Sequence, residues 1–366
     1  MPEAFADTHP THWWTQLPDA RVRCDVCPRA CALKEGQRGL CFVRARQGDA
    51  IVSTTYGRSS GYCVDPIEKK PLNHFLPGTP ILSFGTAGCN LSCRFCQNWD
   101  ISKSRQLDTL QQQATPDMIA RAAEQLGCRS VAVTYNDPVI FMEYAMDTAD
   151  ACHERGIRAV AVTAGYMELA PAREFYTHMD AANIDLKGFT ERFYRKLCAG
   201  ELKPVLDLLR YLKHETSVWF EITTLLIPGE NDSPEELDAL TRWIATELGP
   251  DVPLHFTAFH PDYRMRDTDR TPATTLRMAR ETGLRNGLHH VYTGNIREKA
   301  TQSTYCQGCG ARLIGRDGYQ LSDWNLNAHG DCVRCGTPLP GRFEPQAGSW
   351  GSRRMPVRFD GNSPRS

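Results

Sequence analysis

The stretch GTAGCNLSCRFCQNWD (residues 85–100) places three cysteines in one short loop, directly after an apolar run at 80–86 that we interpret as a strand. The cysteines are Cys89, Cys93 and Cys96, spaced C-x3-C-x2-C. A structural zinc ion needs a fourth protein ligand, and His74 is only a weak candidate nearby. Each iron of an iron–sulfur cubane takes a terminal ligand, so three cysteines leave one iron free for a small molecule. The loop therefore predicts a [4Fe-4S] cluster with one open position.

Strand-like and helix-like segments alternate after this loop. The strand-like runs are 80–86, 130–135, 157–166, 181–188, 218–229 and 253–260. The helix-like segments are 115–127, 139–156, 233–249 and 271–283. Three of these segments begin or end with helix signals such as Thr115-Pro116, Ser233-Pro234 and Gly249. This alternation predicts βαβ units and an α/β fold with a parallel sheet.

Polar residues recur at the carboxyl ends of these strand-like runs. They are Asn136, Asp137, Thr163, Asp185, Lys187 and His260. A barrel assembles its site from residues at that edge, so the pattern favours a barrel over a doubly wound sheet. We therefore predict a partial (β/α)6 barrel of the TIM type. On residue type alone, the Asp185–Lys187 pair could equally lie on the surface, and a single histidine such as His260 is more often structural.

Two further cysteine sets flank this region. The C-terminal set predicts a closed tetrahedral site for zinc, with iron as the alternative, although its 22 intervening residues slightly exceed the usual zinc-ribbon range. Its members are Cys306, Cys309, Cys332 and Cys335. The N-terminal set is spaced too tightly for two matched knuckles, and it could bind one zinc or a second cluster that relays electrons. Its members are Cys24, Cys27, Cys31 and Cys41.

Composition narrows the functional classes. The chain has 366 residues, 15 cysteines and a formal net charge of -1, which gives no support to binding of nucleic acid or of an anionic membrane. No apolar run approaches a membrane span, and the N-terminus shows no secretory signal, so we expect a cytoplasmic protein. Clustered cysteines in a reducing compartment more often bind metal than form disulfides. The isolated Cys128, Cys152 and Cys198 are interpreted as buried structural thiols, whereas Cys63 is left open.

The loop motif, with the aromatic Phe95 before the last cysteine, resembles the signature of the radical S-adenosylmethionine (radical SAM) superfamily. The resemblance implies that the free iron chelates the amino and carboxylate groups of S-adenosylmethionine. One electron from the cluster, supplied by a flavodoxin-like or ferredoxin-like donor, then cleaves the C–S bond. The resulting 5'-deoxyadenosyl radical abstracts hydrogen from a substrate, and the protein positions and shields the cofactor.

The middle of the chain is also similar to activating enzymes of glycyl-radical proteins, such as pyruvate formate-lyase activase. The matching segments are NIDLKGF, LLIPGENDS and TAFHP. This resemblance implies that Asp185, Lys187 and His260 lie beside S-adenosylmethionine, along with Phe95 and Thr163. Two departures are that YNDP (135–138) replaces the family's Gly-Gly-Glu and that Thr223 stands where the family has arginine. The acceptors Asn136 and Asp137 in YNDP suit the methionine ammonium group.

A resemblance over nearly the whole chain points to the radical enzymes of the AmmeMemoRadiSam system. It rests on CDVCPRAC, DPIEKKPLNHFLPGTPILSFGTAGCNLSCRFCQNWDIS, TYNDP, VYTGN and TYCQGCGARLIGRDGYQ. It implies an association with Memo-like and AMMECR-like proteins but not a particular reaction. On these grounds we expect an N-terminal cysteine-rich region (1–75), a radical SAM core (76–298), a zinc-ribbon-like module (299–345) and a disordered tail (346–366).

Three functional hypotheses follow from the sequence. The first is a radical enzyme that takes hydrogen from a glycine of a partner protein. The second keeps the radical chemistry but changes the substrate to another protein residue or a small molecule. The third is a metal-stabilised binding module without catalysis. Formation of 5'-deoxyadenosine by the reconstituted protein distinguishes the first two from the third.

Overall fold

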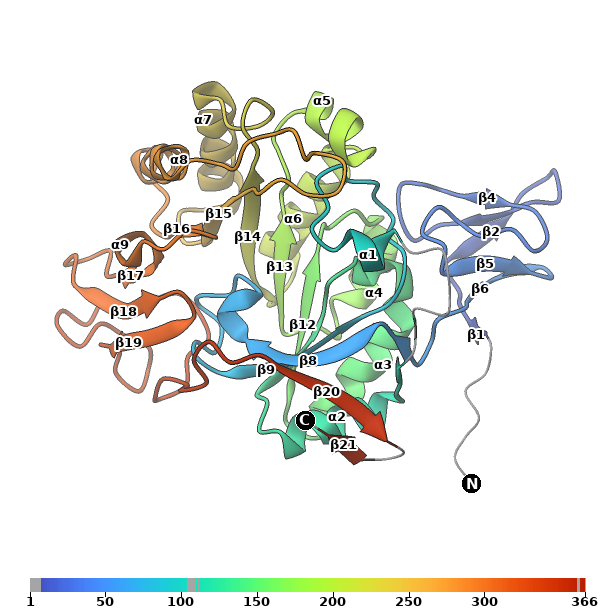
Figure 1. The fold of residues 1–366 in the computed structure, drawn as a ribbon, viewed down its shortest axis with the longest axis horizontal. Helices are drawn as coiled ribbons and strands as arrows, with labels where there is room; N and C mark the ends of the chain where they lie inside the picture. Colours follow the sequence, from blue (N-terminus) through green and yellow to red (C-terminus); the bar gives the residue numbers. More distant parts are fainter. Residues whose placement is uncertain (1–7, 104–109, 111, 361–362, 366) are drawn as a thin grey trace.

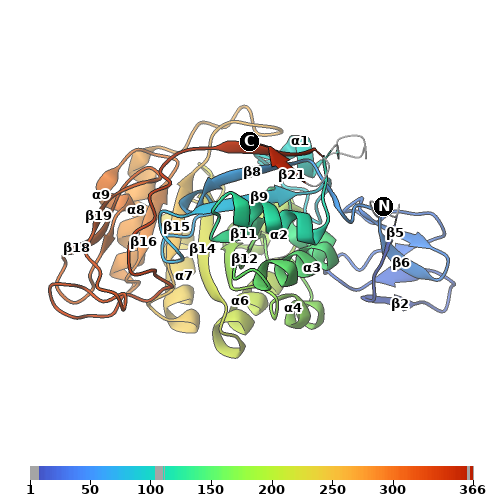
Figure 2. The same cartoon turned by 90° about the horizontal axis from the view of Figure 1, so that it is seen from below.

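The structure, a computed structural model, describes residues 8–103, 110, 112–360 and 363–365. Figure 1 shows a central unit of strands and helices, with an N-terminal module on one side (blue) and a C-terminal module on the other (orange). Figure 2 shows the same separation after a turn of 90°. None of the helices in the described part of the chain has the length and apolar character needed to cross a membrane.

The central unit is built on one sheet of ten strands. The order is β16-β15-β14-β13-β12-β11-β9-β8-β20-β21. The parallel strands follow each other in sequence order, which is the arrangement of a partial barrel rather than of a doubly wound sheet. Their bounds are β9 (Pro80–Gly85), β11 (Ser130–Val133), β12 (Arg158–Thr163), β13 (Ala181–Asp185), β14 (Trp219–Leu226), β15 (Leu254–Ala258) and β16 (Val291–Gly294). The predicted fold class is thereby confirmed.

Helices connect successive parallel strands and cover the sheet (Figures 1 and 2). All four predicted helical segments are present: α2 (Pro116–Gln125), η3 (Pro138–Phe141) with α3 (Met142–His153), α7 (Pro234–Trp243) with η5 (Ile244–Leu248), and α8 (Ala273–Arg285). The side chains of Thr115 and Ser233 accept N-cap hydrogen bonds at the starts of α2 and α7. The sequence did not predict several other helical segments, among them α4 (Leu169–Phe175), α5 (Glu191–Phe193) with η4 (Tyr194–Cys198), and α6 (Lys203–Glu215).

The two flanking modules are made of short antiparallel strands. The N-terminal module contains β1 (His9–Pro10), β2 (Trp14–Gln16), β3 (Val22–Cys24), β4 (Ala32–Leu33), β5 (Arg44–Gln47) and β6 (Ala50–Ser53). In the chain this module is followed by β7 (Arg58–Ser59), β8 (Gly61–Pro66) and η1 (Ile67–Lys69); β8 joins the central sheet beside β9, and β10 (Gln112–Gln113) pairs with β7. The C-terminal module contains α9 (Lys299–Gln302), β17 (Thr304–Tyr305), β18 (Arg312–Asp317) and β19 (Gln320–Trp324).

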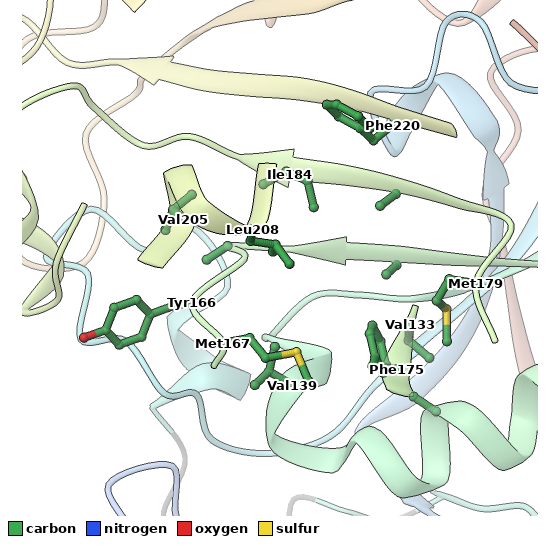
Figure 3. Packing of buried hydrophobic residues seen from close by; sticks show 14 of the residues in the cluster. Val133, Val139, Tyr166, Met167, Phe175, Met179, Ile184, Val205, Leu208 and Phe220 are labelled. Atoms are coloured by element: carbon green, nitrogen blue, oxygen red, sulfur yellow. The ribbon is translucent and has the colours of Figure 1, made fainter. Parts of the chain in front are cut away.

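The core lies between the parallel strands and their covering helices. Figure 3 shows this packing, in which Ile184 of β13 lies near Val205 and Leu208 of α6, and Val133 of β11 lies near Phe175 of α4. All five side chains are buried. The apolar strand runs that predicted the sheet therefore also supply its core.

The expectation of a disordered tail over 346–366 does not hold for the described part of that stretch. Met355–Asp360 forms β20, which pairs antiparallel with β8, and Val357 is buried there. Strand β21 (Ser363–Arg365) follows, whereas residues 361, 362 and 366 lie outside the described part. The Gly, Ser and Arg residues at 349–354 led to the prediction of disorder, although a strand follows them. The edge of β8 supplies the backbone hydrogen-bond partners of this strand.

We predict that replacing Arg44 by methionine strongly destabilises the contact between the N-terminal module and the barrel. Arg44 of β5 and Glu143 of α3 form a fully buried ion pair at 2.6 Å, and Arg44 Nε donates to Ile140 O. Removing one partner leaves a buried carboxylate unpaired, which costs about 3–5 kcal/mol of unfolding free energy. Urea unfolding measures the loss. The double variant Arg44→Met/Glu143→Leu should recover most of it, and equal losses in both variants would contradict the argument.

Candidate functional site

A cleft of about 1400 Å3 opens at the carboxyl ends of the parallel strands. The predicted residues that line it are Cys89, Cys93, Phe95, Cys96, Asn136, Asp137, Thr163, Asp185 and Lys187. These residues come from four separate connections along the sheet, and the barrel brings them to one wall. The structure thus assembles the predicted cysteine loop and most of the predicted polar residues in one place.

The loop between β9 and α1 (Trp99–Ser102) is held by close backbone contacts at its start. Asn136 accepts from Thr86 N at 3.1 Å and donates to Gly88 O at 2.9 Å. Gly88 has φ +80°, and a Cβ placed there would lie 1.9 Å from Cys41 O. Glycine is therefore required at 88 for two reasons, the left-handed backbone and the approach of another chain segment. Asn136 positions the loop, because both ends of its amide are engaged by the backbone.

Asp137 and Thr163 form a second hydrogen-bonded pair on the cleft wall. Asp137 Oδ1 accepts from Thr163 Oγ1 at 2.8 Å and from Val139 N, and Oδ2 accepts from Ala164 N at 3.0 Å. Burial raises the pKa of Asp137, although these donors act in the opposite direction. A carboxylate can accept about four hydrogen bonds, so Asp137 keeps capacity for a donor in the cleft.

Asp185 and Lys187 form an ion pair beside the cysteine loop. The distance from Lys187 Nζ to Asp185 Oδ2 is 2.8 Å. Burial would lower the pKa of Lys187, but the Asp185 carboxylate and the thiol of Cys93 raise it well above its ordinary value. The pair lines the cleft, so it faces the site and is not the surface pair that residue type alone allowed.

The three loop thiols differ in their surroundings. A hydrogen bond with the Cys198 thiol lowers the pKa of Cys93, and the cation of Lys187 acts in the same direction. Burial and the Asp137 carboxylate raise the pKa of Cys89 to about 12. Cys96 Sγ lies 3.0 Å from Ser102 Oγ. Cys198, which was interpreted as a structural thiol, is buried as expected. Its thiol also contacts Cys93, so Cys198 lies next to the predicted cluster ligands.

The predicted histidine does not line the cleft. His260 is exposed, and its Nδ1 lies 3.0 Å from Nε2 of Gln97, a residue of the cleft wall. His255, five residues earlier on β15, lines the cleft, and its Nε2 lies 2.7 Å from Glu221 Oε2. His255 could have been predicted from the sequence, because side chains two residues apart on a strand lie on the same face, and both His255 and Thr257 line the cleft. His74 is buried against Tyr292 and Pro340, which removes it as a ligand for the loop.

Sequence reasoning also missed most of the charge in the cleft. The basic residues of its wall are Lys69, Lys70, Lys103, Lys187, Arg270, Arg297, Arg316 and Arg354, and the acidic ones are Glu68, Asp100, Asp137 and Asp185. Lys69 and Lys70 both pair with the buried Asp65 at 2.8 Å, and Arg354 comes from the tail. These residues are scattered over the chain, so spacing in the sequence carries no signal for their convergence.

The C-terminal cysteines form a compact group of four thiols. Their four Sγ atoms all lie within 4.8 Å of one another, with Cys306–Cys335 at 3.5 Å and Cys309–Cys332 at 3.8 Å. A Zn–S bond of about 2.3 Å in a tetrahedron places the sulfurs about 3.8 Å apart. The set fits a single ion, and zinc and iron both accept this geometry.

We predict that Cys306→Ser removes this ion and destabilises the C-terminal module, while the cysteine loop of the barrel keeps its iron. Binding free energy at such a site is also folding free energy, so β18 and β19 should lose protection from hydrogen exchange. Metal analysis should show one ion fewer per chain, with the iron of the barrel retained. Cys128→Ala, at a buried thiol outside the three sets, is the matched control. Unchanged metal content in Cys306→Ser would contradict the assignment.

Comparisons with known proteins give the following similarities. The sequence profile of the radical SAM superfamily matches residues 84–241. An uncharacterized protein of Methanocaldococcus jannaschii is 38% identical over 328 residues, which cover 89% of this chain and 97% of that protein. The pyruvate formate-lyase-activating enzyme of Listeria monocytogenes serovar 1/2a is 25% identical over 183 residues, which cover 46% of this chain and 71% of that enzyme. The solved radical SAM methyltransferase from Sphaerobacter thermophilus has a TM-score of 0.47 at 14% identity, covering 78% of this chain and 76% of that one.

Proposed function

We propose, on the premise that this chain belongs to the radical SAM superfamily, that it is an enzyme that takes a hydrogen atom from a substrate by radical chemistry. The [4Fe-4S] cluster would be held by Cys89, Cys93 and Cys96, and S-adenosylmethionine would bind at the open iron. One observation carries this proposal: three cysteines stand on the wall of a cleft of about 1400 Å3.

When bound, these cofactors supply one electron to the sulfonium group and a 5'-deoxyadenosyl radical that takes hydrogen from the substrate. The chain's own groups prepare the site. Lys187 favours the thiolate form of Cys93, and Asn136 fixes the backbone that leads into Cys89. Asp137 keeps an acceptor position for the methionine ammonium group, as proposed from its place in YNDP.

The first candidate substrate is a glycine on a partner protein. Its support is the similarity of the middle of the chain to pyruvate formate-lyase-activating enzymes. The proposed partners are an electron donor of the flavodoxin or ferredoxin type and, from the resemblance over the whole chain, Memo-like and AMMECR-like proteins.

The second candidate is a small anionic molecule, favoured by the charge of the cleft. Eight basic and four acidic side chains line it. Two of the basic residues, Arg270 and Arg297, are exposed at its rim, where they could meet a phosphate or carboxylate group. This candidate keeps the same radical chemistry and changes only the source of the hydrogen atom.

Deuterium transfer tests the proposal and separates the two candidates. The reconstituted, reduced protein is mixed with S-adenosylmethionine and with either the protein fraction or the low-molecular-mass fraction of an extract from deuterated cells. Deuterium in 5'-deoxyadenosine from the protein fraction supports the glycine candidate, and deuterium from the small-molecule fraction supports the second. The absence of any 5'-deoxyadenosine from protein that shows the spectrum of a cubane would overturn the proposed function.

A further inference from the structure

The four N-terminal cysteines line a small, partly open cavity between the N-terminal module and the barrel. The cavity is lined by Cys24, Val26, Cys27, Arg29, Cys31, Gly39, Cys41, Arg44, Asn90, Val139 and Ile140. Two positive-φ residues, Ala30 and Phe42, adjoin Cys31 and Cys41 and turn the chain beside them. Strained, non-glycine backbone of this kind is typical of ligand sites. All four thiols line the same cavity, although their spacing in the sequence fits neither a helix nor a strand period.

The spacing of these thiols differs from that of the C-terminal set. Among the described residues, the C-terminal cysteines are the one group of three or more potential ligands whose atoms all lie within 4.8 Å of each other. The N-terminal cysteines therefore stand farther apart than a single tetrahedral ion requires. In a cubane each of the four irons carries one thiolate, so the four thiolate sulfurs stand farther apart than they do around a single ion. The C-terminal and N-terminal cysteine sets of this chain therefore differ in the spacing of their sulfur atoms.

The charge around the cavity also fits a cluster. Arg44 is a buried cation on the cavity wall, and its Nη1 has no hydrogen-bond partner although Nε and Nη2 are engaged. The unpartnered Nη1 of Arg44 lies beside four cysteines and is a suitable hydrogen-bond donor to cluster sulfur, while its ion pair with Glu143 remains in place.

The cavity adjoins the cysteine loop of the barrel through the backbone. Cys41 O lies so close to Gly88 that a Cβ there would approach it to 1.9 Å, and Gly88 directly precedes Cys89. On the other side, Arg29 Nε donates to Asn90 O at 2.8 Å, and Asn90 lines the cavity. Cys27 and Cys31 are half-buried, so one side of the set lies near the surface. The two cysteine sites are therefore neighbours in the fold.

We propose that Cys24, Cys27, Cys31 and Cys41 bind a second [4Fe-4S] cluster, which passes electrons from a protein carrier to the cluster at Cys89. A fully ligated cluster has no open iron, so its task is electron transfer. The carrier loses one electron, the N-terminal cluster gains it and then loses it to the loop cluster, and no bond or proton changes at the N-terminal site. The relay rests on the proposed function, whereas the presence of the cluster does not.

Metal analysis of the full chain tests the cluster independently of any activity. In Cys89→Ala/Cys93→Ala/Cys96→Ala, anaerobic reconstitution should leave about four irons and about four acid-labile sulfides per chain, with a cubane signal in the reduced state. Adding Cys27→Ser and Cys31→Ser to this variant should remove them, whereas adding Cys128→Ala and Cys152→Ala should not. An additional zinc per chain with no labile sulfide, or labile sulfide that persists without Cys27 and Cys31, would overturn the proposal.

The choice of reductant tests the relay. In Cys27→Ser/Cys31→Ser, the rate of 5'-deoxyadenosine formation with reduced flavodoxin, divided by the rate with dithionite, should fall about tenfold or more. Cys128→Ala/Cys152→Ala should keep the wild-type ratio. An unchanged ratio in the first variant would overturn the relay. If wild type makes no 5'-deoxyadenosine even with dithionite, the proposed function fails instead, and the metal analysis still decides whether the cluster exists.

Discussion

Replacing Cys93 by alanine is expected to abolish 5'-deoxyadenosine formation. Cys93 is the buried member of the loop set, and its thiolate form is favoured by Cys198 and Lys187. Without this ligand a second iron of the cubane is left open, and the cluster should be lost or unable to hold S-adenosylmethionine in one orientation. Anaerobic reconstitution followed by chromatographic assay of 5'-deoxyadenosine measures the effect, with Cys128→Ala as the control at a buried thiol far along the chain.

The neighbouring Cys198 sharpens this test. Its thiol is in hydrogen-bonding contact with Cys93, so in the single variant it is the one cysteine placed to take over as a ligand. Residual cluster in Cys93→Ala that disappears in Cys93→Ala/Cys198→Ala would identify Cys198 as a substitute ligand. Full activity in the double variant would contradict the assignment of Cys93 to the cluster.

The sequence predicted the cysteine loop and the barrel because both signals are local. Three cysteines within eight residues predict a metal site whatever surrounds them, and buried strand runs such as SVAV (130–133) alternate with capped helices. The position of β20 could not be predicted in this way. Its strand residues at 355–360 follow a Gly, Ser and Arg-rich stretch, and their partner β8 lies about 290 residues earlier in the chain.

The cleft wall shows the same limit at the level of single residues. Counting strand ends found Asp137, Thr163 and Asp185, which do line the cleft. It also named His260, which ends the strand-like run 253–260, and it did not identify His255. The actual face is set by alternation along β15 and by Glu221, whose carboxylate holds His255 from the neighbouring strand. Such a pairing depends on strand order, which periodicity does not reveal.

Replacing Gly88 by alanine is expected to remove most of the iron bound by the loop and to disturb the N-terminal cysteine set as well. The left-handed backbone at φ +80° costs an alanine about 1–2 kcal/mol. The larger effect is steric, because the new methyl group would lie 1.9 Å from Cys41 O, and a backbone carbonyl cannot rotate away as a side chain can. Either Cys89 or Cys41 must move, and both belong to cysteine sets that need fixed positions. Iron content after reconstitution measures the loss.

Gly127→Ala is the matched control for this variant. Gly127 also has a left-handed backbone, at φ +67°, but a Cβ there would meet no atom within 4 Å. The two variants therefore share the conformational cost and differ in the contact with Cys41. Gly127→Ala should bind the wild-type amount of iron. Gly88→Ala should lose iron both from the loop site at Cys89 and from the N-terminal site at Cys41. Normal iron in Gly88→Ala would show that the loop and the N-terminal module are not in contact, and this result would also remove the structural basis for electron transfer between them.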